Sequence, residues 1–335
     1  MALGRNLVAN YLGQAWTTLI SLVFIPVYIR YMGVESFGLI GVFTLLQAWL
    51  ALFDMGMTPT LSREMARYTA GAHTPQSIRD LLRSLETIGL AMSVAIGLLV
   101  WAAADWLRVG KLPVETVSQA IALMGAVVAL RFVEGLYRGA ILGLQRQVFY
   151  NAVNSLFATL RAVGAVAVLA WVSPTIEAYF VWQGIVSILS LAALAAAAHR
   201  ELPRPPHPPR FSQQAIRGIW RFAGGMLATT FLVLLLMQVD KILLSRLLSL
   251  EDFGYYTLAV TVASAISLLV SPISQAFFPR FTEIASRGDY EELRSEYHRG
   301  AQFVTILVAP LAMILILFVH PTSASISSSS SPGSD

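Results

Sequence analysis

Long apolar runs recur along the whole chain, and they constrain its fold more than any other feature. Each run is about 20 residues long, which is enough to cross the roughly 30 Å hydrocarbon core of a bilayer. A backbone that crosses lipid must satisfy its own hydrogen bonds, and these runs are too long and too uniformly apolar for barrel strands. The sequence therefore predicts an all-α polytopic membrane protein with about nine spans. Their expected positions are residues 7–30, 36–59, 82–104, 116–137, 151–171, 177–198, 220–244, 253–275 and 301–319.

Composition excludes several other classes of protein. Only 13% of the residues are charged, against about 25% in soluble domains. The net charge of +4 comes from basic residues that are scattered between the apolar runs, so we expect no nucleic-acid partner. There is no cysteine, and the five histidines form no spaced ligand set with carboxylates, so we expect no metal and no cofactor. The connections leave no room for a soluble catalytic domain, and we expect no enzyme activity.

The basic residues are unevenly divided between alternate connections. Placing the N-terminus in the cytoplasm leaves only Arg30, Arg108, Lys111, Lys241 and Arg246 on the outer side. The inner side then holds Arg5, Arg63, Arg67, Arg79, Arg83, Arg138, Arg146, Arg200, Arg204, Arg210, Arg217, Arg221, Arg280, Arg287, Arg294 and Arg299. Because Lys and Arg accumulate in cytoplasmic loops, the sequence predicts a cytoplasmic N-terminus.

A proline-rich connection, residues 199–219, divides the chain into a six-helix lobe (1–198) and a three-helix partial lobe (220–319). Such a segment resists helix formation and acts as a semi-rigid cytoplasmic linker. Directly after its prolines, Ile216, Ile219 and Phe222 fall at helical spacing. They indicate either an amphipathic helix on the membrane surface or the start of the seventh span.

An internal repeat relates the two lobes. The segment 34–38 (Val-Glu-Ser-Phe-Gly) opens the second span, and 250–254 (Leu-Glu-Asp-Phe-Gly) opens the eighth. Downstream, Pro59 and Pro279 are each followed by an arginine. Both copies run in the same direction, which predicts a parallel repeat about an axis along the membrane normal.

The end of the chain does not fit this repeat. By the repeat, the second lobe lacks its last three helices, and residues 320–335 are rich in serine. We expect a truncated second lobe with a disordered, non-native tail. The alternative is a natural disordered tail.

Several motifs resemble one family. They are Asn10-Tyr11-Leu12-Gly13-Gln14, the run 26–33 (Pro-Val-Tyr-Ile-Arg-Tyr-Met-Gly) with Phe37-Gly38, Asp54-Met55-Gly56, the connection from Arg138-Gly139-Ala140 to Gly143-Leu144-Gln145-Arg146, and Asp240-Lys241. Together they make the chain, from about residue 5 to residue 318, similar to the O-antigen type polysaccharide flippases. These belong to the multidrug/oligosaccharidyl-lipid/polysaccharide exporter superfamily.

The resemblance implies a protein of the bacterial inner membrane with two six-helix bundles related by a pseudo-twofold axis. It implies alternating access, with an undecaprenyl-diphosphate-linked oligosaccharide moved to the outer leaflet for surface polysaccharides such as O-antigen. The partners would be that lipid-linked oligosaccharide, membrane lipid and proteins of polysaccharide assembly. The alternatives are a cation-coupled multidrug exporter of the same superfamily, an inactive truncated flippase and, last, a membrane sugar polymerase or transferase.

Three charged residues inside predicted spans are the candidate substrate ligands, because ionisable groups are costly in lipid. Arg161 lies near the middle of the fifth span, where its guanidinium suits a diphosphate. The alternative is an ion pair with a carboxylate on another helix. On the fourth span, Glu134 lies at helical spacing between Arg131 and Arg138. These residues form either a neutral salt-bridge strip or a cationic entry for the diphosphate that Glu134 tunes.

Two acidic residues are candidates for binding a coupling proton or sodium ion. Asp54 lies near the inner end of the second span, and Asp240 lies toward the outer end of the seventh. A carboxylate within a helix bundle can carry such an ion. Equally, each can fix a helix end or pair with a neighbouring arginine.

Overall fold

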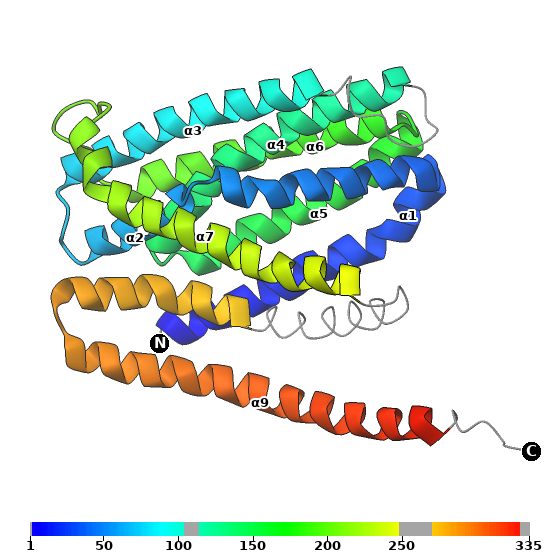
Figure 1. Ribbon diagram of the computed structural model, residues 1–335. Helices are drawn as coiled ribbons and strands as arrows, with labels where there is room; N and C mark the ends of the chain where they lie inside the picture. The colour runs from blue at the N-terminus through cyan, green and yellow to red at the C-terminus, as the bar shows by residue number, and fades with distance from the viewer. Residues whose placement is uncertain (1, 104–113, 248–269, 329–335) are drawn as a thin grey trace, which may run out of the picture.

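The computed structural model describes residues 2–103, 114–247 and 270–328, and every regular element in them is an α-helix. In chain order the helices are α1 (Ala2–Phe53), α2 (Met57–Thr69), α3 (Pro75–Ala103), α4 (Val114–Gly143), α5 (Gln147–Trp171), α6 (Ile176–Glu201), α7 (Gln213–Leu247) and α9 (Tyr290–Ser328). Residues 270–287 are also helical. The long helices lie side by side and reverse direction from one to the next, as Figure 1 shows.

Five described stretches are long and apolar enough to cross a membrane: Gly4–Gly33, Pro75–Ala102, Ser118–Gly143, Gln147–Trp171 and Ile176–Glu201. The all-α prediction is therefore confirmed, whereas the total of nine spans stays a prediction. Most of the predicted eighth span and its repeat motif at 250–254 lie outside the described residues. Large apolar side chains remain exposed along α1, α3, α5, α6 and α7, among them Leu12, Leu98 and Leu236. Wide apolar surfaces of this kind suit helices whose surrounding solvent is lipid.

The first two predicted spans are two helices that follow each other within α1, and the chain turns back between them (Figure 1). The break is Gly33, with φ 81° and ψ 163°. A second break separates α1 from α2, where Met55 and Gly56 have positive φ values of 48° and 73°. A Cβ atom at Gly56 would lie 2.8 Å from the carbonyl oxygen of Ala223, so α7 passes too close for any larger residue.

The first six spans pack around one apolar core. Buried side chains from α1 to α6 form it, and an aromatic cluster lies near its centre, where Tyr28 contacts Tyr179 and Phe43 contacts Phe180 edge to face. α4 packs on α2 through three glycines that follow each other at intervals of four residues. They are Gly135, which faces Thr58, Gly139 and Gly143. Small residues at this spacing let two helix backbones approach closely.

The proline-rich linker is shorter than predicted, because α6 continues to Glu201 and α7 begins at Gln213. α3 holds it in place. The backbone N–H groups of His207, Arg210 and Ser212 donate to the side chains of Gln76, Asp80 and Ser84, at 3.1, 2.9 and 2.8 Å. These three acceptors are four residues apart and share one face of α3. Three backbone donors of the linker that have no helical partner are thereby satisfied.

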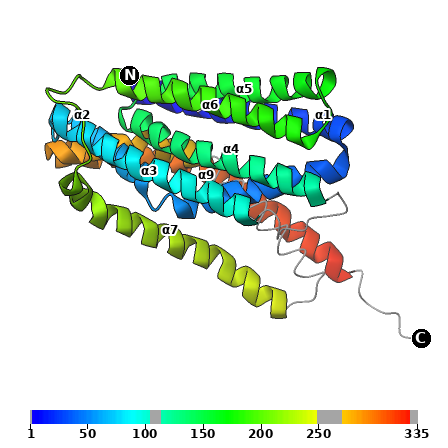
Figure 2. The same ribbon diagram turned by 90° about the horizontal axis from the view of Figure 1, so that it is seen from above.

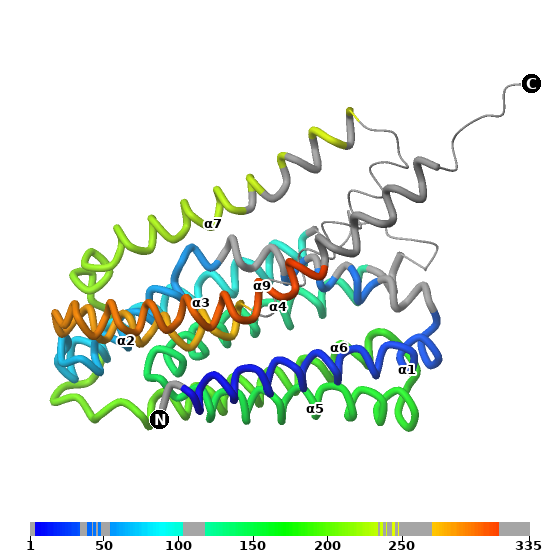
Figure 3. Tube along the Cα trace, turned by 90° about the horizontal axis from the view of Figure 1, so that it is seen from below, coloured from blue at the N-terminus to red at the C-terminus, as the bar shows by residue number. Residues whose placement is uncertain are grey.

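α7 resolves the open question about the segment after the linker. Ile216, Ile219 and Phe222 belong to one continuous helix with the predicted seventh span and do not form a separate surface helix. Ile219 is buried against the core of the first lobe. From there α7 diverges from the other helices toward its C-terminal end, as Figures 2 and 3 show from opposite sides.

α9 differs from its prediction at both ends. It begins at Tyr290, eleven residues earlier than expected, and it continues to Ser328. The expectation of a disordered tail from residue 320 is therefore wrong up to Ser328, and residues 329–335 lie outside the described part of the chain. Neither Pro321 nor the serines of this stretch favour a helix, so its sequence carries no signal for the extension.

Segment 270–287 packs beside the N-terminal turns of α1 (Figure 1). Leu7 forms a small apolar cluster with Ile273, Ala276 and Phe277. The linker, the α2–α3 loop and the turn before α9 lie at the same end of the molecule, on the left of Figure 1. This is the end that carries most of the arginines predicted to be cytoplasmic.

Candidate functional site

A cavity of about 480 Å³ opens among α1, α5 and α6 in the first lobe. Its wall is mostly apolar, with the hydroxyl groups of Thr17, Ser21 and Thr44 on the α1 side. Arg161 and Gln183 supply the strongly polar groups on the opposite side. An apolar cavity with a few converging polar groups is the usual form of a ligand site.

Arg161 is paired with a carboxylate on another helix. Its Nη2 lies 3.2 Å from Oε2 of Glu134 on α4, and both side chains are about 15% exposed (16% and 15%). The other carboxylate oxygen of Glu134 accepts a hydrogen bond from the hydroxyl of Ser190 at 2.8 Å. The pairing that we gave as the alternative for Arg161 is therefore the one observed. Its Nε has no hydrogen-bond partner among the described residues.

Arg131 is held by neutral groups. Its guanidinium donates to Oε1 of Gln47 at 2.8 Å and to Oε1 of Gln183 at 3.3 Å, and it lies 5.1 Å from the ring centre of Phe43. The sequence suggested that Glu134 contacts Arg131 and Arg138 on its own helix. In the structure Glu134 forms its ion pair with Arg161 instead. Two guanidinium groups and one carboxylate thus lie near the cavity, only Arg161 is paired with the carboxylate, and the cluster carries a positive charge.

Asp54 fixes the start of α2. Its carboxylate accepts the backbone N–H of Thr58 at 3.2 Å and the Thr58 hydroxyl at 2.6 Å. This is the structural role that we set beside ion coupling, since a carboxylate at a helix N-terminus satisfies free donors and the helix dipole. Whether Asp54 also carries an ion stays a prediction. The side chain of Asp240 lies outside the described residues.

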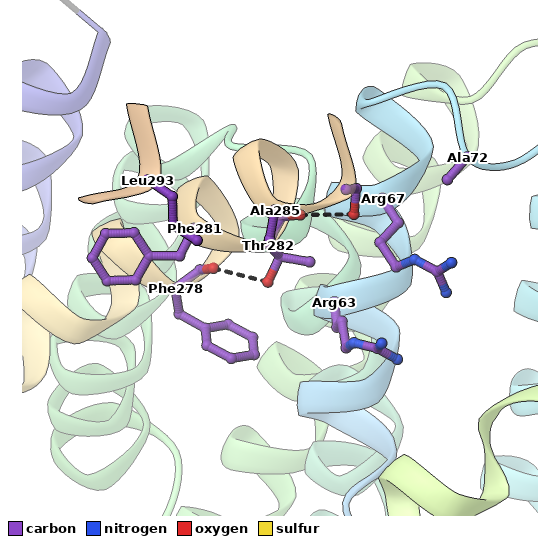
Figure 4. A pocket seen from close by; sticks show the side chains of 9 residues that line it. Arg63, Arg67, Ala72, Phe278, Phe281, Thr282, Ala285 and Leu293 are labelled. Atoms are coloured by element: carbon purple, nitrogen blue, oxygen red, sulfur yellow. Dashed lines mark hydrogen bonds between the residues drawn. The ribbon is translucent and has the colours of Figure 1, made fainter. Parts of the chain in front are cut away.

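A second cavity, of about 500 Å³, separates α2 from segment 270–287. Figure 4 shows Arg63 and Arg67 of α2 on one wall and the rings of Phe278 and Phe281 on the other. Pro59 and Pro279 belong to these same two elements. A pseudo-twofold axis would place the two copies of a repeat opposite each other in this way, and the repeat itself stays a prediction.

Glu64 is the centre of a charged cluster that the sequence did not predict. Its carboxylate is 1% exposed and contacts Arg63 at 2.8 Å, Arg67 at 2.9 Å and His73 at 2.7 Å. Burial acts to raise the pKa of this carboxyl, but the His73 hydrogen bond and the two guanidinium charges outweigh it and lower the pKa. The sequence assigned these arginines only to membrane orientation.

A set of amides joins the two lobes, and we call Asn10, Gln147 and Asn151 the amide clamp. Nδ2 of Asn10 donates to Oε1 of Gln147 and to the backbone oxygen of Pro272, each at 3.1 Å. Nε2 of Gln147 donates to the backbone oxygen of Gln275 at 3.0 Å. Asn151 completes the set by donating to Oδ1 of Asn10 at 2.6 Å.

Pro279 explains why the clamp is placed here. In a helix the oxygen of Gln275 would accept the N–H of residue 279, and proline has none. Gln147 supplies the missing donor from the other lobe. The usable sequence signal was therefore a proline inside a helix, together with neutral amides at the ends of spans.

Comparisons with known proteins agree with this fold. Residues 3–285 match the family model of the polysaccharide biosynthesis protein family. A Shigella flexneri protein that is named as an O-antigen transporter is 20% identical over 323 residues, which cover 95% of this chain and 75% of that protein. The succinoglycan biosynthesis transport protein ExoT of Rhizobium meliloti is 24% identical, and the match covers 95% of this chain and 61% of that protein.

Solved structures of transporters share the arrangement of helices. A mutant of a MATE protein superposes with a TM-score of 0.78 at 13% identity, over 97% of this chain and 74% of that one. A transporter of the MOP superfamily from Pyrococcus furiosus superposes with a TM-score of 0.73 at 13% identity, over 95% and 72%. At this level of identity the likeness shows the fold alone. With its family match over residues 3–285, this multi-pass membrane chain belongs to the polysaccharide biosynthesis protein family.

Proposed function

We propose that the chain carries lipid-linked oligosaccharides across the bacterial cytoplasmic membrane, for the assembly of surface polysaccharide. Its family supports this proposal, as do the names of its relatives in O-antigen and succinoglycan transport. The observation that carries the proposal is the cavity beside Arg161, because the described residues that line it include an arginine and no carboxylate.

The charges beside the cavity suit a phosphate-bearing substrate. A lipid diphosphate brings negative charge into a region of low dielectric, where guanidinium groups bind it bidentately. Arg161 already lines the cavity, and Gln183 links the cavity to Arg131. Glu134 neutralises only one of the two guanidinium groups. The diphosphate would therefore compete with Glu134 for Arg161 and gain the remaining charge of Arg131.

The proposed orientation places the N-terminus and the arginine-rich end in the cytoplasm. The amide clamp then joins the lobes on the cytoplasmic side, and α7 diverges toward the outer side. Alternating access requires the clamp to open when the substrate enters from the inner leaflet. Asp54 and Asp240 remain our candidates for coupling this motion to a proton or sodium ion.

The test is transport of the lipid-linked oligosaccharide in proteoliposomes that contain the full chain. Substrate that reaches the far leaflet is measured by its accessibility to an added glycosidase. Arg161→Gln should lower the rate about tenfold or more, because a hydrogen bond to a charged group contributes about 1.5–3 kcal/mol. Arg30→Gln, a change at an exposed arginine, is the matched control and should leave the rate unchanged.

Two outcomes would count against the proposal. Equal rates for Arg161→Gln and Arg30→Gln would remove the cavity from the mechanism. Proton-driven or sodium-driven efflux of a cationic dye, with no movement of the lipid, would favour a multidrug exporter of the same superfamily.

A further inference from the structure

A third cavity, of about 300 Å³, lies between α3, α6 and the linker, on the arginine-rich end of the molecule. Arg79, Arg83, Glu86, His199 and Pro209 line it. It is distinct from the cavity beside Arg161, and the proposed transport does not use its residues. Among its charged side chains, Arg79 is already engaged in hydrogen bonds, whereas Arg83 can still bind a further ligand.

The engaged side chain is Arg79. The guanidinium of Arg79 donates to the backbone oxygens of His199, Leu202 and Pro203, at 2.7, 2.6 and 3.1 Å. It also donates to Nδ1 of His199 at 2.9 Å. Since arginine only donates, Nδ1 carries no proton, and Nε2–H of His199 donates to Glu86 at 2.9 Å. Four of the five N–H donors of Arg79 are therefore engaged in holding the end of α6.

The side chain that can still bind a ligand is Arg83. Its side chain is 59% exposed, and its nearest carboxylate oxygen, on Glu86, is 3.5 Å away. At this distance Arg83 forms an ion pair with Glu86 but no charge-assisted hydrogen bond, so its planar fork of donors can still bind an anion. Pro209 at the rim places the exposed Arg210 next to the cavity. Arg79 and Arg83 outnumber the single carboxylate of Glu86, so the cavity attracts an anion.

The surface beyond Arg83 indicates what kind of anion fits. Thr87, Leu90 and Val94 follow Arg83 at intervals of four, three and four residues, so they continue one face of α3. Leu90 and Val94 are 60% and 55% exposed. A phosphate bound at Arg83 would thus have an exposed apolar strip leading away from it into the bilayer. A free phosphate ion would make no use of this strip, whereas acyl chains would lie along it.

We propose that this cavity binds the phosphate of an anionic phospholipid in the inner leaflet, with Arg83 as the main ligand and the acyl chains along Leu90 and Val94. Basic pockets between membrane helices on the cytoplasmic side are suited to anionic headgroups. The linker forms the rim of the pocket, so the bound lipid would also stabilise the linker against α3.

The experiment is native mass spectrometry of the purified full chain in detergent, with dioleoyl phosphatidylglycerol, dioleoyl phosphatidylcholine or inorganic phosphate added. We expect phosphatidylglycerol to be retained at least about fivefold better than phosphatidylcholine, since one arginine near an anionic headgroup contributes about 1 kcal/mol. Arg83→Gln should remove this preference, and Arg83→Lys should restore part of it. Arg294→Gln, at an exposed arginine of α9, is the matched control and should keep it.

Three results would overturn the proposal. Equal retention of the two lipids would exclude an anionic headgroup site. Equal losses in Arg83→Gln and Arg294→Gln would reduce the effect to net charge. Displacement of phosphatidylglycerol by an equal concentration of inorganic phosphate would make this a site for the free ion. None of these results depends on transport, so they leave the proposed function untouched.

Discussion

Replacing Gln147 with methionine should loosen the contact between the two lobes. Methionine has nearly the same length and volume, but it cannot donate to the backbone oxygen of Gln275. That oxygen has no donor within its own helix, because Pro279 stands at the position where the N–H would be. Gln147 itself is fully buried. The substitution therefore leaves a buried carbonyl unsatisfied only while the lobes are joined.

The substitution also removes the acceptor for Nδ2 of Asn10, but that bond lies within the first lobe, so the size of the effect on the contact between the lobes follows from the carbonyl of Gln275. A buried polar group without a partner costs about 1–3 kcal/mol. Once the lobes separate, water can reach the same oxygen, so the cost applies to the joined state alone. A difference of this size shifts the equilibrium between joined and separated lobes about 5- to 150-fold.

The chain has no cysteine, which makes the assay direct. Ala276→Cys puts one thiol into the apolar cluster with Leu7, where the native side chain is 2% exposed. We expect the rate of maleimide labelling to rise at least fivefold when Gln147→Met is added. Gln213→Met, the same change at an exposed position, is the control. A labelling rate that Gln147→Met changes no more than Gln213→Met does would refute the account of the amide clamp.

Three further predictions concern stability in detergent, measured by thermal unfolding. Glu134→Gln and Arg161→Gln should each lower the free energy of unfolding by about 3 kcal/mol, because each single change leaves a mostly buried charge without its partner. The double variant should lose less than the sum of the two, and strictly additive losses would argue against the ion pair. Gly139→Ala should cost about 1–3 kcal/mol, since its Cβ would lie 2.6 Å from a backbone oxygen of α2, whereas Gly97→Ala, with 3.7 Å of room, should be neutral or slightly stabilising. Because the pKa of Glu64 is lowered in the folded state, its contribution to stability is complete above its ordinary pKa of 4.5 and is lost as the pH falls below that value. Glu64→Gln should flatten the dependence of stability on pH in that range, and an unchanged dependence would contradict the role given to Glu64.

The helices could be predicted from sequence because lipid imposes one rule on every span. Apolar length alone placed α5 and α6 to within about four residues, but α3 begins seven residues before its predicted span and α4 ends six residues after its own. It also placed the break between the first two spans, which lies at Gly33, but not the end of the second, which stops at Phe53. The extension of α9 to Ser328 was missed because a serine-rich segment that contains Pro321 gives no signal for a helix.

The partners of charged residues were harder to predict than the residues themselves. Spacing along α4 favoured bonds from Glu134 to its own helix, since neighbours three and four residues away are the only contacts that a sequence displays. The observed partner, Arg161, comes from α5 and depends on how the two helices cross. Buried amides such as Asn10 are uncharged, so their presence in a span gives no sequence signal, although their hydrogen bonds join the lobes.

The linker has a mechanical consequence, because three hydrogen bonds fasten it to α3 and Ile219 is packed in the core of the first lobe. A linker that is held along its length cannot extend or bend when the second lobe moves. Any swing of the second lobe must then be taken up farther along α7. Gly224 and Gly225 are the first positions there with open space around both backbones. The hinge between the lobes would thus lie inside α7, about three turns from its start at Gln213, and the proline-rich segment would move with the first lobe as a rigid part of it.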